Sequence, residues 1–259
     1  MMRGDPADTV SDAANLPYPD RHAPGRCAYF LDFDGTLVDL AQRPSDVSVA
    51  PELPALIAGL HSAAGGALAL ISGRPLADID HLIGLNYLPV AGQHGSERRD
   101  AHGKVHIHPV DVDALSELRT RAQRWCAMHP GLVLEDKGLS IALHYRTAPE
   151  LATVAEHFVR DAVGDGNSDF QIQAGKMVFE IKPCGRDKGK AIEEFLAEFP
   201  FVGRLPVFVG DDVTDEHGFA AVNALGGVSI KVGEGVTAAR WRIQNVAEVH
   251  RWLRNALAG

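Results

Sequence analysis

The chain has 259 residues, which is enough for one large domain or two smaller ones with buried cores. Hydrophobic residues make up 46% and charged residues 23%, a balance that excludes a chain disordered throughout. Asp and Glu number 34 against 25 Lys and Arg, and the net charge of −9 argues against a nucleic-acid partner bound through its phosphates. A small anionic substrate remains compatible if a metal or a local group of cations outweighs this charge.

Three widely spaced cysteines, Cys27, Cys126 and Cys184, form no C-x-x-C pair and favour a reducing cytoplasm. No run of apolar residues is long enough to span a membrane, and residues 1–24 lack the apolar stretch of a signal peptide. These 24 residues contain four prolines and little periodicity, so we expect a flexible leader. The sequence predicts a cytoplasmic protein, without a membrane partner, whose fold begins after this leader.

Short apolar runs that end in polar residues predict buried parallel strands. They are Cys27–Leu31, Ala67–Ile71, Val207–Val209 and Val228–Val232. Apolar residues at helical spacing predict helices at Pro51–Ala64, Leu76–Ile83 and Lys188–Phe199. Because strands and helices alternate, we expect an α/β fold with a parallel sheet flanked by helices.

The middle of the chain has alternating segments together with two longer helical patterns. Its predicted strands are Lys104–His108, Leu132–Glu135, Ser140–His144, Phe170–Gln173 and Met177–Ile181, and its predicted helices are Val112–His129 and Pro149–Val163. We expect an inserted α+β unit at 98–183, between a first core part at 25–97 and a second core part at 184–259. Arg98 and Arg99, at the first boundary, are predicted to lie on a solvated hinge surface.

Acidic residues follow two of the predicted strands, whose carboxyl ends are where ligands bind in open α/β sheets. Asp32 and Asp34 come after the first strand, and Asp211, Asp212 and Asp215 come after the third. Carboxylates packed this closely repel one another unless a cation lies between them or one of them is protonated. A lone Asp after a strand is usually a helix cap or a turn residue, but two such groups favour a site. Oxygen ligands from two strands suit Mg²⁺, so we expect a magnesium site here.

Four segments resemble, in the right order, the signatures of the haloacid dehalogenase-like phosphotransferases. They are D-F-D-G-T-L at Asp32–Leu37, I-S-G-R at Ile71–Arg74, the lysine of D-K-G at Asp187–Gly189, and G-D-D-V-T-D-E at Gly210–Glu216. Within that superfamily the sequence is similar to the trehalose-6-phosphate phosphatases. The form of the last signature contributes to this likeness, with G-Q-H-G at Gly92–Gly95, E-D-K at Glu135–Lys137, H-Y-R at His144–Arg146 and G-K-M-V-F-E at Gly175–Glu180. The resemblance implies a Rossmann-like core with an inserted cap domain.

The resemblance also implies an activity, the Mg²⁺-dependent hydrolysis of trehalose 6-phosphate through an aspartyl phosphate. In this assignment Asp32 is the nucleophile and Asp34 is the acid and base. Ser72 and Lys188 hold the transferring phosphoryl oxygens. The implied metal-binding residues are Asp32, Asp34 through its backbone carbonyl, and Asp211. Asp212 and Asp215 are implied to be either further ligands or residues that contact the ligands.

The inserted unit is implied to be a cap that closes over the site and recognises the leaving group. By resemblance Glu135, Lys137 and Glu180 contact the distal glucose, and His94 meets the sugar from the core. Glu135 and Lys137 are two residues apart, so on a strand they face the same side. For Arg74 two interpretations stay open, a contact with the substrate and a structural ion pair.

Two other functions stay open on the sequence. A related capped phosphatase acting on sucrose phosphate, mannosylglycerate phosphate or a hexose phosphate would share the core and differ in the cap. A catalytically silent sugar-phosphate sensor would need neither Asp32 nor Asp34, and both residues are intact. In each case the ligand is a small sugar phosphate. Association with a trehalose-6-phosphate synthase is not decided by the sequence.

Overall fold

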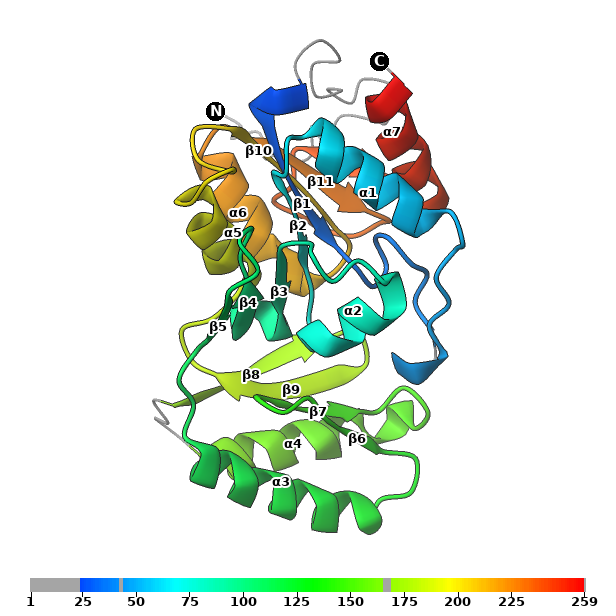
Figure 1. The fold of residues 1–259 in the computed structure, drawn as a ribbon. Coiled ribbons are helices and arrows are strands. Elements are labelled where there is room, and N and C mark those ends of the chain that lie inside the picture. Colours follow the sequence, from blue (N-terminus) through cyan, green and yellow to red (C-terminus); the bar gives the residue numbers. More distant parts are fainter. Residues whose placement is uncertain (1–23, 42–43, 165–168, 259) are drawn as a thin grey trace, which may run out of the picture.

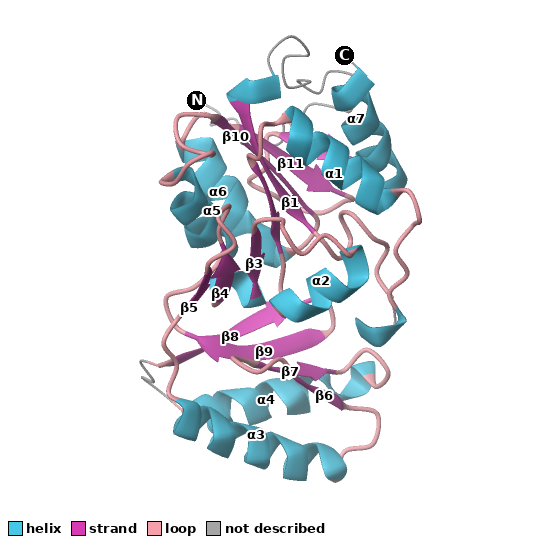
Figure 2. Cartoon of the chain, in the orientation of Figure 1, coloured by secondary structure: helices cyan, strands magenta, loops and turns pink. Residues whose placement is uncertain are grey.

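The computed structural model describes residues 24–41, 44–164 and 169–258, so the predicted leader at 1–24 lies outside the described residues except for Pro24. Two sheets lie one above the other in Figure 1, a larger one in the upper part and a smaller one in the lower part. Figure 2 shows helices packed against both sheets. The site described below lies where the two parts face each other.

The larger sheet has eight strands in the order β12-β11-β10-β1-β2-β3-β4-β5. From β12 to β3 the strands run parallel, whereas β4 and β5 pair antiparallel. The strands are β1 Cys27–Asp32, β2 Leu68–Ile71, β3 Val90–Gly92, β4 Glu97–Arg99, β5 Val105–Ile107, β10 Leu205–Gly210, β11 Val228–Val232 and β12 Trp241–Ile243. The predicted α/β class with a parallel sheet is confirmed.

Helices cover both faces of the larger sheet. One face carries α1 (Leu53–Ala63), α2 (Leu76–Ile83) and α7 (Val246–Ala258). The other carries α5 (Lys188–Leu196) and α6 (Glu216–Ala224) (Figure 1). Helices on both faces bury both sides of the central strands, as parallel sheets require.

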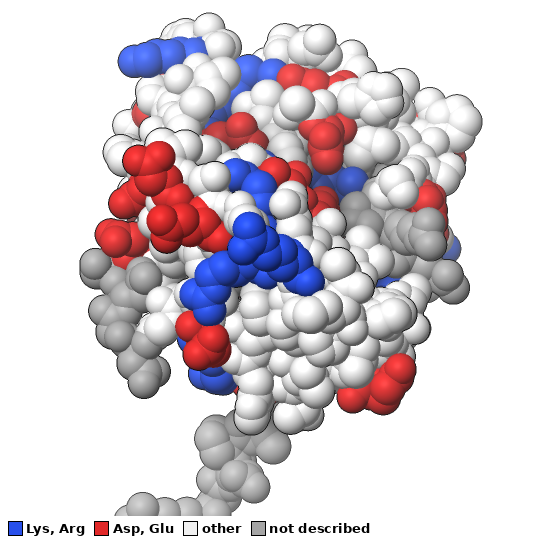
Figure 3. Space-filling model, turned by 90° about the horizontal axis from the view of Figure 1, so that it is seen from below, with Lys and Arg blue, Asp and Glu red and all other residues white. Residues whose placement is uncertain are grey.

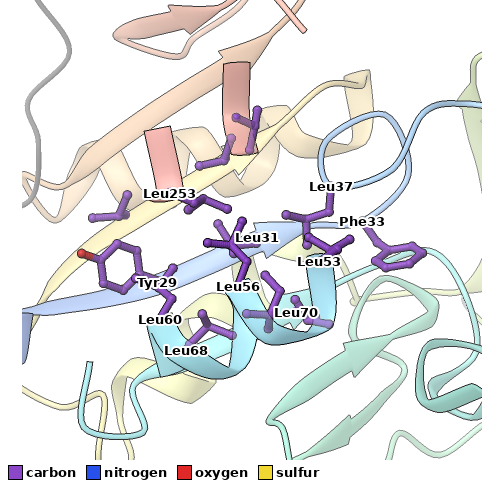
Figure 4. Packing of buried hydrophobic residues seen from close by; sticks show 14 of the residues in the cluster. Tyr29, Leu31, Phe33, Leu37, Leu53, Leu56, Leu60, Leu68, Leu70 and Leu253 are labelled. Carbon is purple, nitrogen blue, oxygen red and sulfur yellow. The ribbon is translucent and has the colours of Figure 1, made fainter. Parts of the chain in front are cut away.

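Alternate residues of β1 supply the two apolar cores. Tyr29 and Leu31 pack with residues of α1 and α7 on one side of the sheet (Figure 4). Phe30 points to the other side, where its ring stacks on Phe201 with centroids 5.6 Å apart. Successive side chains of a strand point to opposite faces, so one continuous apolar run fills both layers. This double burial holds the end of β1, and therefore Asp32, in a fixed place.

The smaller sheet is antiparallel, with the order β6-β7-β9-β8. Its strands are β6 Val133–Asp136, β7 Ile141–His144, β8 Phe170–Gly175 and β9 Val178–Pro183. Two helices, α3 (Val112–Ala127) and α4 (Ala152–Val163), pack on one face around a core of their own. The other face is turned toward the larger sheet (Figure 1). This is the inserted α+β cap that the sequence predicts.

The predicted start of the cap, at residue 98, is wrong. Residues Lys104–His108 contribute β5, which pairs with β4 at the edge of the larger sheet. Alternating side chains identify a strand but not the sheet that it joins, which is why the sequence placed this strand in the cap. Arg98 and Arg99 are also buried, each in an ion pair with carboxylates, rather than solvated. The four-stranded unit therefore begins after β5.

The lower end of the molecule, which α3 and α4 form in Figure 1, carries charges of both signs. Figure 3, seen from below, shows Lys and Arg side chains close to Asp and Glu side chains. Arg119 and Arg121 of α3 pair with Asp136 at 2.7 Å and with Asp161 at 3.1 Å. Along the described part of the chain, no helix is both long enough and apolar enough to cross a membrane.

Candidate active site

Acidic side chains from two neighbouring strands meet at the carboxyl edge of the larger sheet. Asp32 is the last residue of β1, and Asp211 follows the last residue of β10, which pairs with β1. One carboxylate oxygen from each of Asp32, Asp211 and Asp215 lies within 4.8 Å of the others, and all three residues are buried. The structure thus brings together three of the five aspartates that the sequence singled out.

Lys188 places a cation between two of these carboxylates. It is the first residue of α5, whose start is fixed by Asp187, because the Asp187 side chain accepts a hydrogen bond from the Lys190 backbone N–H. Lys188 Nζ lies 2.7 Å from Asp32 Oδ1 and 2.6 Å from Asp215 Oδ1. Burial alone would lower the pKa of Lys188, but the charges of Asp215 and Asp32 outweigh it and hold the pKa above its ordinary value. Lys188 is therefore a fixed positive charge beside the predicted nucleophile.

The three buried carboxylates fit a divalent cation. Burial, followed by the charge of Asp215, raises the pKa of Asp32 well above its ordinary value, although Lys188 opposes this. Burial also raises the pKa of Asp211. Burial is the main cause of both shifts, because it disfavours the charged form of a carboxylate. A cation held between these oxygens would restore their charged forms, and clustered carboxylate oxygens are a donor set that suits Mg²⁺.

Asp215 fixes the backbone around this cluster. Its Oδ2 accepts hydrogen bonds from the backbone N–H groups of Asp211 and Asp212, both at 2.9 Å. Asp212 is half-buried and lines the same cavity as Asp32, but among the described residues it is outside the group of three clustered carboxylates. Asp215 thus shapes the loop as well as contributing charge.

Asp34 forms a two-pronged ion pair with Arg74. Arg74 Nε and Nη2 lie 2.7 and 2.8 Å from the two carboxylate oxygens of Asp34. Of the two interpretations of Arg74, the structure shows the ion pair, although both residues line the cavity. Gly35 follows with φ +81°, and a Cβ at this position would lie 2.3 Å from Asp211 Oδ2. Only glycine combines this left-handed backbone with room for the neighbouring strand's carboxylate.

Ser72 directly follows β2 and is buried. Its hydroxyl oxygen accepts a hydrogen bond of 3.1 Å from the backbone N–H of Arg74, so it stabilises the turn that presents Arg74. Ser72 is not among the described residues that line the cavity, whereas its neighbour Gly73 is. The hydroxyl proton is not used in this bond, so Ser72 also has a hydrogen to donate.

Glu180 is the centre of a hydrogen-bond network on the cap side. Its carboxylate accepts bonds from Lys137 Nζ at 2.9 Å and Ser140 Oγ at 2.7 Å, and His94 Nε2 lies 3.2 Å away. Burial opposes ionisation of Glu180, but Lys137 outweighs it and holds the Glu180 pKa well below its ordinary range. Burial lowers the pKa of His94 to about 4, so its ring is neutral at pH 7. Lys137 also donates to the carbonyl of Gly73 at 3.0 Å, which ties the cap to the core.

Most of the cap and core residues predicted from the sequence line one cavity. Glu135 contributes from β6 and pairs with His144 on β7 at 2.7 Å. Burial would raise the pKa of Glu135, but the His144 hydrogen bond and the charge of Lys137 lower it. The cavity residues from the sequence prediction are Asp32, Asp34, Arg74, His94, Glu135, Lys137, Glu180, Lys188, Asp211 and Asp212.

Of two further cationic residues of this cavity, sequence reasoning missed Lys176 and left Arg146 open between a contact with the ligand and a structural role. Lys176, in the turn between β8 and β9, pairs with Asp211 Oδ2 at 2.7 Å and so links the cap to the aspartate cluster. It lies in the same G-K-M-V-F-E segment as Glu180, which was the signal that could have identified it. Arg146 donates to the carbonyls of Ala41 in the core and Lys176 in the cap. The H-Y-R segment identified Arg146 as a candidate, but its partners are distant in sequence, so the sequence could not show which contacts it makes.

An aspartate cluster with a buried lysine at the carboxyl edge of a parallel sheet, facing an inserted α+β unit, defines the class: a phosphatase with a haloacid dehalogenase-like fold. Residues 30–246 match the model of the Trehalose-phosphatase family. The chain therefore belongs to the trehalose-phosphatase family, whose members are phosphoric monoester hydrolases.

Individual relatives agree with this assignment. The chain is 44% identical over 230 residues to the trehalose-6-phosphate phosphatase of Escherichia coli strain K12, covering 87% of this chain and 85% of that one. It is 45% identical over 214 residues to a probable trehalose-phosphate phosphatase of Sinorhizobium fredii, covering 82% and 79%. The solved C-terminal domain of the C. albicans trehalose-6-phosphate phosphatase has the same fold, with a TM-score of 0.80, 20% identity and coverage of 94% and 98%.

Proposed function

We propose that this chain hydrolyses trehalose 6-phosphate to trehalose and phosphate, with Mg²⁺ as its cofactor and an aspartyl phosphate as intermediate. The observation that carries the proposal is one shared cavity. It is lined by the Asp32–Lys188 pair of the core and by the Glu180–Lys137 pair of the cap. The first pair suits phosphoryl transfer, and the second suits a ligand with many hydroxyl groups. The relatives' names supply the particular sugar phosphate.

In this proposal the core residues carry the displacement at phosphorus. An Asp32 carboxylate oxygen forms a bond to phosphorus while the bond from phosphorus to the sugar oxygen breaks. Asp34 gives its proton to that sugar oxygen. Water then attacks the phosphorus of the aspartyl phosphate and passes a proton to Asp34, which releases phosphate and restores both side chains. Lys188 compensates the charge on the phosphoryl oxygens from its place beside Asp32.

The groups that would bind the metal in this proposal are the Asp32 carboxylate, the Asp34 backbone carbonyl and Asp211. Asp212 and Asp215 would be further ligands or would contact the ligands. When bound, Mg²⁺ supplies the positive charge that offsets the phosphoryl group and the clustered carboxylates. Asp215 holds the loop of Asp211 and Asp212 through its two backbone hydrogen bonds. A chain with net charge −9 thus acquires a local anion-binding site.

The cap residues bind the leaving group. A disaccharide presents both donors and acceptors, and Glu135, Lys137 and Glu180 offer acceptors and a donor on one side of the cavity. Glu180 stays ionised because its pKa is held low, so it accepts from sugar hydroxyls at any pH near neutrality. Neutral His94 adds a further contact from the core side. Contacts with the enclosed sugar favour the disaccharide ester over smaller esters.

Phosphate release from trehalose 6-phosphate by the purified chain tests the proposed reaction. We expect D32N to remove turnover, and we expect EDTA to remove it until Mg²⁺ is added back. D39N is the matched control, because Asp39 lies on the same segment, is exposed and is not among the described residues lining the cavity. Full activity of D32N would refute Asp32 as the nucleophile, and full activity in EDTA would refute the metal requirement.

A substrate panel separates this proposal from a related sugar phosphatase. We expect trehalose 6-phosphate to be turned over faster than sucrose phosphate, mannosylglycerate phosphate and glucose 6-phosphate. E180A should lower turnover of trehalose 6-phosphate relative to phenyl phosphate. E156A, which alters an exposed ion pair of α4, should leave that ratio unchanged. An unchanged ratio in E180A would refute the sugar-binding role of Glu180, and calorimetric binding without turnover would instead support a sensor.

A further inference from the structure

The turn from β3 to β4 belongs to the core, contacts the cap, and contains an unusual backbone. Gln93 and His94 are consecutive residues with φ of +46° and +55°, a left-handed conformation that residues other than glycine rarely adopt. Both residues are buried. Such backbone persists only where surrounding contacts enforce it, and it is found preferentially at functional positions. His94 reaches the cavity, whereas Gln93 is not among the described residues that line it.

The Gln93 side chain is oriented by a carboxylate. Gln93 Nε2 donates to Glu97 Oε1 at 2.9 Å, and the same oxygen accepts the backbone N–H of Leu76 at 2.8 Å. Because an ionised carboxylate only accepts hydrogen bonds, it must face the NH₂ group of the amide. The amide oxygen of Gln93 therefore points the other way and is available as an acceptor.

That oxygen bonds to the cap. Gln93 Oε1 accepts the backbone N–H of Leu139 at 3.1 Å, and Ser140 Oγ lies 3.4 Å away. The Ser140 hydroxyl has one proton, and its shorter contact of 2.7 Å is to Glu180. The Leu139 bond is therefore the main link between Gln93 and the cap.

Leu139 belongs to the turn between β6 and β7, which carries the sugar-facing lysine. The turn is closed by a hydrogen bond of 3.0 Å from the Lys137 backbone N–H to the Ser140 carbonyl. The side chains of Lys137 and Ser140 both donate to Glu180. A core residue that fixes this turn therefore fixes the donors that surround Glu180.

We infer that Gln93 is a positioning residue for leaving-group recognition: its amide oxygen docks the β6–β7 turn on the core and so sets the place of Lys137 and Glu180 over Asp32. Gln93 does not touch the sugar in this assignment. The inference rests on the proposed function, in which Lys137 and Glu180 bind the sugar. It adds a specificity determinant that lies outside the cavity.

The variant Q93N tests the role with little risk to the fold. Asn accepts the left-handed region better than other residues with a side chain, and it withdraws the amide oxygen from Leu139 by one methylene. We expect the kcat/KM for trehalose 6-phosphate, taken relative to that for phenyl phosphate, to fall roughly tenfold, the loss typical of one neutral hydrogen bond. If Q93N is poorly folded, Q93M, which keeps the length of the side chain without its polar atoms, provides the same comparison.

The control is Q171N. Gln171 of β8 also makes two backbone contacts, to the carbonyls of Pro183 and Arg186 at 3.3 and 3.2 Å, but neither partner belongs to the β6–β7 turn. We expect its substrate ratio to match the wild type. Equal loss on both substrates in Q93N would show a merely structural role and overturn the inference.

A double variant shows whether Gln93 acts through the turn. If it does, Q93N combined with K137M should lower the substrate ratio little more than K137M alone, since both changes remove the same contact with the sugar. If the losses of the substrate ratio in Q93N and K137M instead multiply in the double variant, Gln93 acts elsewhere and the inference is overturned. If the wild type prefers another sugar phosphate, the proposed substrate is wrong, and the same ratio measured with that ester still tests Gln93.

Discussion

Lys182 on β9 is a buried cation whose removal should stabilise the protein. Its side chain is 1% exposed, and within the described residues its Nζ has no hydrogen-bond partner. Burial lowers its pKa from 10.5 to about 8; nearby Lys188 and Lys137 add to this effect, while Glu180 and Asp187 oppose it. We expect K182M, which keeps the length of the side chain but removes the charge, to be more stable than the wild type.

The pKa of Lys182 gives the size of this effect. Each pKa unit corresponds to about 1.4 kcal/mol, so keeping the buried ammonium charged costs the fold about 3 kcal/mol. Below pH 8 both the folded and the unfolded chain carry the proton, and the full cost applies. Between pH 8 and pH 10.5 the unfolded chain binds more protons than the folded chain, so wild-type stability rises with pH. The advantage of K182M should therefore be largest at pH 7 and shrink as pH approaches 10.5.

Urea unfolding of both proteins at pH 7 and pH 10 measures the difference in the free energy of unfolding. K104M is the control, because Lys104 is exposed and its charge costs the fold nothing comparable. A K182M protein that is less stable than the wild type at pH 7 would refute the reasoning. A stabilisation that does not change with pH would refute it as well, because the gain would then arise from packing and not from charge.

Three further predictions concern the core site. G35A should lower turnover by roughly a hundredfold, because its Cβ would displace the Asp211 carboxylate, and a wild-type rate in the phosphate-release assay would contradict this. K188M removes the cation that pairs with both Asp32 and Asp215, which leaves buried carboxylates without a partner. It should reduce the free energy of unfolding, measured in urea, by about 3–5 kcal/mol, and an unchanged value would contradict this prediction. The pKa of His94 is about 4 in the folded chain and 6.5 in the unfolded chain, so the unfolded chain binds the proton first. The free energy of unfolding should therefore fall as pH falls from 6.5 toward 4. An NMR titration of its ring with a midpoint near 6.5 would show that burial does not act on it.

The core half of the site could be predicted because parallel strands have a fixed polarity. Asp32 and Asp211 are far apart in sequence, yet each lies at the carboxyl end of an apolar strand and at the same edge of the sheet. No distance information was needed for that inference. Lys188 was assigned only through the resemblance of its D-K-G segment, because a lysine at the start of a helix is usually solvated and the sequence does not show that this one is buried.

Three of the shortest strands were not predicted, for a physical reason. β3, β4 and β12 have three residues each, too few to establish a period, whereas β5 was predicted as a strand and assigned to the wrong sheet. The helix α7 is different, because Val246, Val249 and Leu253 have helical spacing and could have revealed it. Long-range ion pairs such as Lys176 with Asp211 cannot be read from spacing, because they depend on how the cap sits over the core.

The cap half of the site depends on strand order more than on residue type. In the register of the smaller sheet, Glu135 on β6 pairs with Ala142 on β7, Ala142 pairs with Glu180 on β9, and Glu180 pairs with Gln173 on β8. Paired residues on adjacent strands point to the same face, so these four side chains form one row across the sheet. The small side chain of Ala142 separates the two carboxylates, which both line the cavity. The resemblance identifies Glu135 and Glu180, but the sequence cannot show that β9 lies between β7 and β8, and this order is what brings both acids to one cavity.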